Sequence, residues 1–127
     1  MDLTDDRGSA VAEFVMVGAL LTVLTVAVLQ LGLAMMVRNT VLDAASEGAR
    51  FGSLADNTLA DGRERTIDLI TTAVGPDFAH DVSIGTGEFL GHPAVVVTAR
   101  VPLPLVGLWG FSGTVEVVGH AALETVR

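Results

Sequence analysis

The chain has 127 residues, of which 50% are hydrophobic and 17% are charged, and its 7 basic residues, all arginine, face 15 acidic ones for a net charge of −8. Because soluble domains carry about 25% charged residues, this composition favours a membrane protein. The scattered arginines exclude a typical nucleic-acid-binding surface, and the absence of cysteine excludes disulfides, cysteine-ligated metals and thiol nucleophiles.

The first element in chain order is a long apolar run. From Ala10 to Val37 the only ionisable side chain is Glu13, and the run exceeds the ~20 apolar residues that cross a hydrocarbon core. We therefore expect one membrane-spanning helix. Its polar positions, Thr22, Thr25 and Gln30, mark either a face that contacts another helix or hydroxyls bonded within their own helix, with Gln30 near the headgroups. Arginines flank both ends of the run, so charge alone sets no orientation.

The acidic residue near the start of this run needs an explanation. A carboxylate at the centre of a bilayer costs about 2.5–3.5 kcal/mol on insertion scales. Glu13 lies only about one turn inside the run, where the N-terminal end of a helix favours an acid by roughly 0.3–1 kcal/mol. Two interpretations remain open on this residue alone, an interfacial acid at a helix start and a functional acid awaiting a partner.

The residues around Glu13 form a motif. The stretch "GSAVAEF", Gly8 to Phe14, places a flexible glycine, small or apolar residues, an acid and an aromatic directly before the apolar run. This resembles the processing signature of type IV prepilins, and its Glu-Phe ending is similar to the Flp and TadE-like branch of the tight-adherence pili. The segment "VRNTVLDAASEGARFGS" after the run and the closing "VVGHAALETVR" also resemble TadE-like proteins.

The resemblance implies a role for each residue of the motif. A prepilin peptidase would cut between Gly8 and Ser9, with Glu13 and Phe14 serving in peptidase recognition and assembly. Glu13 would then neutralise the new amine of Ser9 on a neighbouring helix and set the stagger between subunits, because each charge is cheaper to hold beside the other in low dielectric. The implied partners are the peptidase, other pilins or pseudopilins with the pilus assembly machinery, and the lipid bilayer.

The chain after residue 37 predicts a small domain. The first helix continues in amphipathic form with Val41, Leu42, Ala45 and Ala49 on one side, and Gly52 is its expected stop. A second helix is expected over residues 59–74 with Ile67, Ile70 and Val74 as its apolar stripe, followed by strands in "HDVSIGTGEFL", "AVVVTARV" and "TVEVVGHAALETV". The fold class is therefore α+β and pilin-like: a long transmembrane helix, a second helix and a three-stranded antiparallel sheet leaning on the first helix.

The connection between the last two strands bears large apolar side chains. Its prolines end the ladder before Leu108, Trp109 and Phe111. Such a loop either marks a partner surface or membrane anchor, or folds back to cap the sheet. We expect capping and keep these residues as a possible interaction loop.

No catalytic, metal or cofactor site is expected from the sequence. His80, His92 and His120 share no ligand spacing, and neither a nucleophile elbow nor a phosphate-binding glycine motif occurs. The predicted organisation is a leader at 1–8, a transmembrane helix with its extension at 9–53 and an α+β domain at 54–127, placed outside the cytoplasm on a single-pass protein of the cell membrane or a surface pilus. The alternative is an uncleaved single-span accessory protein that binds another envelope component.

Overall fold

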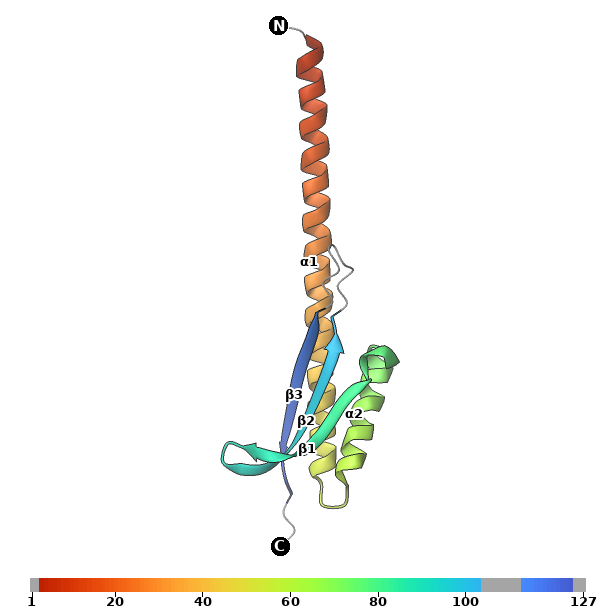
Figure 1. The fold of residues 1–127 in the computed structure, drawn as a ribbon, viewed down its shortest axis with the longest axis vertical. Helices are drawn as coiled ribbons and strands as arrows, with labels where there is room; N and C mark the ends of the chain where they lie inside the picture. Colours follow the sequence, from red (N-terminus) through yellow and green to blue (C-terminus); the bar gives the residue numbers. More distant parts are fainter. Residues whose placement is uncertain (1–2, 104–112, 125–127) are drawn as a thin grey trace. The chain divides into compact units, whose positions relative to one another are not determined.

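The computed structural model describes residues 3–103 and 113–124. In chain order these form α1 (Leu3–Ser53), α2 (Leu59–Ala73), a short 3-10 helix η1 (Pro76–Phe78), β1 (Asp81–Phe89), β2 (His92–Pro102) and β3 (Thr114–Ala122) (Figure 1). The expected α+β class with a three-stranded sheet is confirmed. The described chain divides into two compact units, residues 1–33 and 34–127. The domain boundaries expected from the sequence remain predictions, and the Trp109 loop lies outside the described residues.

The first unit consists of the N-terminal part of α1. From Asp6 to Leu33 the side chains are exposed except that of Gln30, which is half-buried, and the exposed apolar ones lie on every side of the helix, from Val11 and Phe14 to Leu31 and Leu33. The hydroxyls of Thr22 and Thr25 donate to the carbonyls of Gly18 and Leu21 at 2.8 and 2.7 Å, so both threonines bond within their own helix. This is the second of the two roles that the sequence left open for them.

The helix is long and apolar enough to cross a membrane. By length and composition residues Asp6–Ser53 qualify, and none of the apolar window is buried within the protein. In water, a helix with apolar side chains on all sides would expose all of them to solvent, whereas lipid solvates them. The bilayer core offers no hydrogen bonds, but the backbone N–H and C=O groups of a helix are paired within the helix itself. The exposed surface of the first unit is therefore suited to lipid.

The second unit begins with the C-terminal part of α1, which ends at Ser53, one residue after the expected Gly52. The next helix, α2, starts with a capping box: the Thr58 hydroxyl accepts from the Asp61 N–H at 3.2 Å, and the Asp61 carboxylate accepts from the Thr58 N–H at 2.8 Å. It stops where Gly75 takes a φ of 114°, a conformation that glycine adopts without a Cβ clash.

The sheet is an antiparallel meander in the order β1-β2-β3. Its central strand places Val95, Val97, Ala99 and Val101 on the inner face, where each is fully buried, as the alternating pattern predicts. Facing them across the core are α1 residues Val37, Val41, Ala45 and Ala49 and α2 residue Ile70. The sheet therefore leans on the first helix within this unit, as expected.

The buried stripe of α2 differs from the expected one. Gly62, Thr66 and Ile70 are buried, whereas Ile67 and Val74 only pack at the edge of the core. A Cβ added at Gly48 of α1 would overlap the Thr66 hydroxyl and reach the Gly62 carbonyl oxygen at 2.8 Å, and one at Gly62 would lie 2.9 Å from the Gly52 Cα. The two helices thus approach so closely that small residues, not large apolar ones, form their contact.

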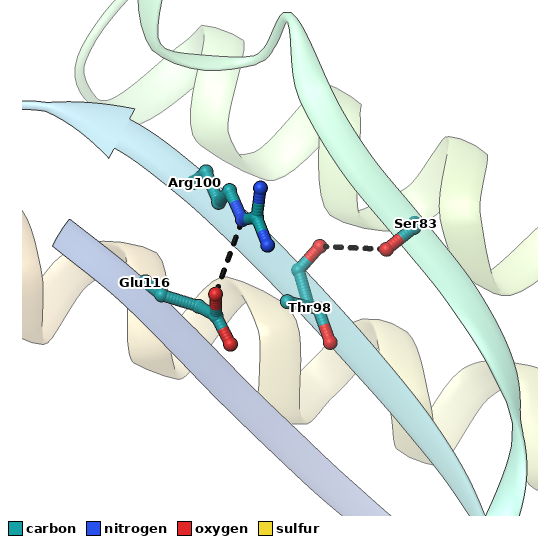
Figure 2. A network of polar contacts seen from close by, with 4 residues as sticks. All are labelled: Ser83, Thr98, Arg100 and Glu116. Carbon is teal, nitrogen blue, oxygen red and sulfur yellow. Dashed lines mark hydrogen bonds and ion pairs between the residues drawn. The ribbon is translucent and has the colours of Figure 1, made fainter. Parts of the chain in front are cut away.

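The outer face of the sheet carries exposed polar cross-strand pairs (Figure 2). Arg100 of β2 lies directly opposite Glu116 of β3, and its Nε donates to Glu116 Oε2 at 3.1 Å. On the other side of β2, the Ser83 hydroxyl of β1 lies 3.5 Å from the Thr98 carbonyl oxygen. This face is solvated and hydrogen-bonded along the strands, so the core lies on the side of the helices.

Candidate processing and assembly site

The residues of the Gly8 to Phe14 motif all lie in the first unit, on one continuous stretch of α1. Gly8 and Ser9 are helical, and Glu13 follows Ser9 by four residues, so these two lie one above the other on the same helix face. Phe14 is 79% exposed. The four predicted residues therefore lie within about two turns of the helix, and all four are exposed.

The glycine at the predicted cleavage position has no packing role in this fold. A Cβ built at Gly8 meets no atom within 4 Å, in contrast to Gly48 and Gly62 of the second unit. Glycine within a helix costs roughly 1 kcal/mol relative to alanine because it loses more backbone freedom. Gly8 is therefore a weak point of the helix that internal packing does not require, and a bond beside it is easier to unwind than its neighbours.

On the helix face of Glu13 the next residues toward the C-terminus are apolar. Met16 and Val17, three and four residues further on, are 70% and 55% exposed, and Glu13 itself is exposed. Among the residues that the structure describes, Glu13 has neither a hydrogen-bond partner nor an ion pair. An acid in this setting is available to a positive group on another molecule.

The histidines lie apart from this motif, in the second unit. The Nε2 atom of His80 lies 3.8 Å from Oδ1 of Asp77, and both side chains are exposed. His92 is also exposed. The His120 ring stacks on the Phe89 ring with the two centroids 4.5 Å apart. Over residues 3–103 and 113–124 no group of three or more metal-ligating side chains comes together. The predicted interaction loop, Leu108, Trp109 and Phe111, lies in the part of the chain that the structure does not describe.

One exposed apolar residue was not singled out from the sequence. Leu90 lies at the tip of the β1–β2 hairpin with a positive φ of 52° and is 83% exposed. The signal that could have found it is the Leu-Gly pair between two strands, where Asn-Gly is the usual sequence for a turn of this type.

The N-terminal segment matches a known protein family. Residues 8–50 match the family described as TadE-like protein, and the match begins at Gly8 and includes Glu13 and Phe14. No curated protein and no solved structure matches the chain. Together with the long exposed apolar helix, the family match indicates a membrane-anchored protein. Residues 8–50 are therefore similar to the TadE-like family, in agreement with the resemblance of the Gly8 to Phe14 motif.

Proposed function

We propose that this chain is a pseudopilin or minor pilin of the tight-adherence pilus system, which is cleaved after Gly8 and takes part in assembly by helix packing in the membrane. The TadE-like match over residues 8–50 supports involvement in that system. The proposed role is structural and requires no catalysis by the chain itself. Its C-terminal domain lies outside the cytoplasm, and its partners are the prepilin peptidase, other pilins and the assembly machinery.

The observation that carries the proposal is the exposed carboxylate of Glu13 near the start of the apolar run of α1, for which the described residues provide no hydrogen bond or ion pair. Cleavage after Gly8 would create an ammonium on Ser9, one turn away along the same face. A charge without a counter-charge is costly to hold in low dielectric. Two staggered copies of the helix would place the ammonium of one beside the carboxylate of the other, so that each charge is neutralised. The pairing therefore favours one stagger between neighbours.

The properties of Gly8 support processing at this position. The residue fills no tight space that would demand glycine. A peptidase has to bind its substrate in extended form, and the helical bond between Gly8 and Ser9 unwinds at a lower cost than a bond between two good helix formers. The alternative is an uncleaved single-span accessory protein that binds another envelope component.

Intact mass of the membrane-extracted protein separates the two functions. The full chain is co-expressed with a matching prepilin peptidase, alone and with the variants Gly8→Leu and Gly18→Leu. The proposed function predicts a product beginning at Ser9 for the parent and for Gly18→Leu, because Gly18 also has open space around its Cα, and an uncut product for Gly8→Leu. An uncut parent chain would favour the accessory protein.

A further inference from the structure

The chain that follows β3 reaches back to the end of α1. The Glu124 backbone N–H donates to the Ser53 carbonyl oxygen at 3.0 Å, and Glu124 Oε2 accepts from the Ala55 N–H at 2.8 Å. One residue thus binds both the last residue of α1 and the connection that leads to α2. Because Glu124 and Ala55 are 69 positions apart in the sequence, only the tertiary structure brings them together.

The residue before Glu124 ties the same segment to the sheet. The Leu123 N–H donates to the Pro93 carbonyl oxygen at 3.1 Å, which extends the pairing of β2 and β3 by one position beyond Ala94 and Ala122. The Leu123 side chain is partly buried against the core. Leu123 and Glu124, here called the strap, therefore join the sheet to the α1–α2 connection at the end of the second unit where β3 and α1 both finish (Figure 1).

The backbone of the strap completes the end of α1. The last four carbonyl groups of a helix have no partner within that helix. The Arg50 carbonyl accepts from the Ser53 hydroxyl at 2.7 Å, and the Phe51 carbonyl accepts from the Asn57 side-chain amide at 2.9 Å, so both are satisfied locally. The Ser53 carbonyl, on a residue that is only 6% exposed, takes its partner from Glu124. A polar group at a buried residue is costly to leave without a hydrogen bond, so the strap stabilises this helix end.

The carboxylate bond of the strap lies in a different environment from the core. Glu124 and Ala55 are both exposed, whereas Val95 and Val97 of β2 and Ile70 of α2 are fully buried. Hydrogen bonds that are exposed to water and lack buried apolar contacts open at a lower free energy than those of a packed core. The strap is therefore less stable than the core to which it binds.

We propose that the strap is a conformational device, which opens while the rest of the second unit stays folded. In the closed state Glu124 holds both Ser53 and Ala55. In the open state the α1–α2 connection is detached from the sheet, and these two residues exchange their protein partner for water. A molecule that binds the strap in its open state would release the connection, since a ligand shifts a conformational equilibrium toward the state that it binds. The device lies within the second unit and does not depend on cleavage after Gly8.

Hydrogen–deuterium exchange of the full-length chain in detergent, followed by mass spectrometry, tests the strap. The variant Glu124→Ala removes the carboxylate and keeps the backbone N–H. We expect peptides that cover residues 53–57 to exchange about tenfold faster or more, because the Ala55 N–H loses a hydrogen bond to a charged group. Peptides from β2 should keep the rate of the parent chain.

Two further variants show whether the effect belongs to this carboxylate. Glu116→Ala is the matched control, because it also removes an exposed, hydrogen-bonded carboxylate from the β3 side of the sheet, and its partner Arg100 lies on the outer face. It should leave exchange over residues 53–57 unchanged. Glu124→Gln keeps an oxygen that can accept from the Ala55 N–H but removes the charge, so its exchange should lie between those of the parent and Glu124→Ala.

Three outcomes would overturn the proposal. Unchanged exchange over residues 53–57 in Glu124→Ala would show that the carboxylate does not hold the connection. A uniform rise over the whole second unit, β2 included, would show a contact that opens only when the entire fold opens. Failure of Glu124→Ala to fold would have the same meaning, because the core is expected to fold without this bond.

Discussion

Gly119 of β3 lies against the backbone of Ala45 in α1. A Cβ at position 119 would come within 2.7 Å of the Ala45 carbonyl oxygen and within 2.5 Å of the Ser46 nitrogen. Because the atoms in the way belong to a helix backbone, no side-chain rotation can make room. This contact fixes the distance between the sheet and the helix that supports it, and it lies within the second unit.

We expect Gly119→Ala to destabilise the second unit. Overpacking of this kind costs about 1–3 kcal/mol of the free energy of unfolding, and a backbone obstacle places the variant at the upper end. Chemical denaturation of the full chain in detergent, followed by the near-ultraviolet signal, measures the change. Gly85→Ala is the control, because a Cβ there meets nothing within 4 Å. Equal losses for the two variants would show that Gly119 does not set this spacing.

The close approach of α1 and α2 predicts that Gly48→Ala is also destabilising, although alanine is the better helix former. The new methyl group would overlap the Thr66 hydroxyl, so we expect a loss of about 1–3 kcal/mol in the free energy of unfolding. The double variant with Thr66→Ala should lose less than the sum of the single variants, because the second change removes the obstructing oxygen. Simple additivity would contradict a direct contact between the two residues.

The capping box of α2 predicts a pH dependence of stability. The hydrogen bond from the Thr58 backbone N–H, followed by the one to the Thr58 side chain, lowers the pKa of Asp61 below its usual value. A depressed pKa in the folded chain means that the stabilisation is present above the pKa of the unfolded chain and is lost as the pH falls through the folded value. We expect the melting temperature to fall in acid with a smaller slope for Asp61→Asn, and equal slopes would argue against the carboxylate.

The ion pair of Arg100 and Glu116 is expected to contribute little to stability. The two side chains point toward each other from neighbouring strands (Figure 2). Both are more than half exposed, at 59% and 51%, so solvent screens their attraction. A double-mutant cycle with Arg100→Gln and Glu116→Gln should give a coupling of about 0.2–1 kcal/mol, decreasing as salt is added. By contrast, the substitution Val97→Ala should lower the free energy of unfolding by about 1 kcal/mol or more, because Val97 is fully buried. A larger coupling for the ion pair would show that the outer face is shielded from water.

The proposed role of Glu13 predicts a selective defect in assembly. Glu13→Gln keeps the shape and polarity of the side chain but removes the charge, so membrane insertion and cleavage after Gly8 should continue. Association with other copies or pilins should drop by about tenfold or more, because the Ser9 ammonium loses its partner. Co-purification from membrane extracts measures the association, with Glu64→Gln on the exposed side of α2 as the control. Undiminished association of the Gln variant would remove the basis for the proposed register.

Much of the fold could be predicted because its signals are local. The alternation of apolar and polar residues in β2 and β3 determines which side chains face the core, and the length of the apolar run indicates a spanning helix. The Gly8 to Phe14 motif was likewise readable, since its spacing along a helix is set by the backbone alone. The same reasoning missed the buried stripe of α2, because Gly62 and Thr66 carry no apolar signal and are buried by the nearness of α1.

The sequence by itself determined the order and type of the elements, the inner face of the sheet and the TadE-like motif, because each follows from chemistry repeated at the period of a helix or a strand. Only the tertiary structure decided how closely α1 approaches α2 and β3, and that Leu90 occupies a left-handed turn in the open. Those features depend on which backbones meet in space, and residues distant in the chain, such as Gly119 and Ala45, reveal nothing of their contact until the fold brings them together.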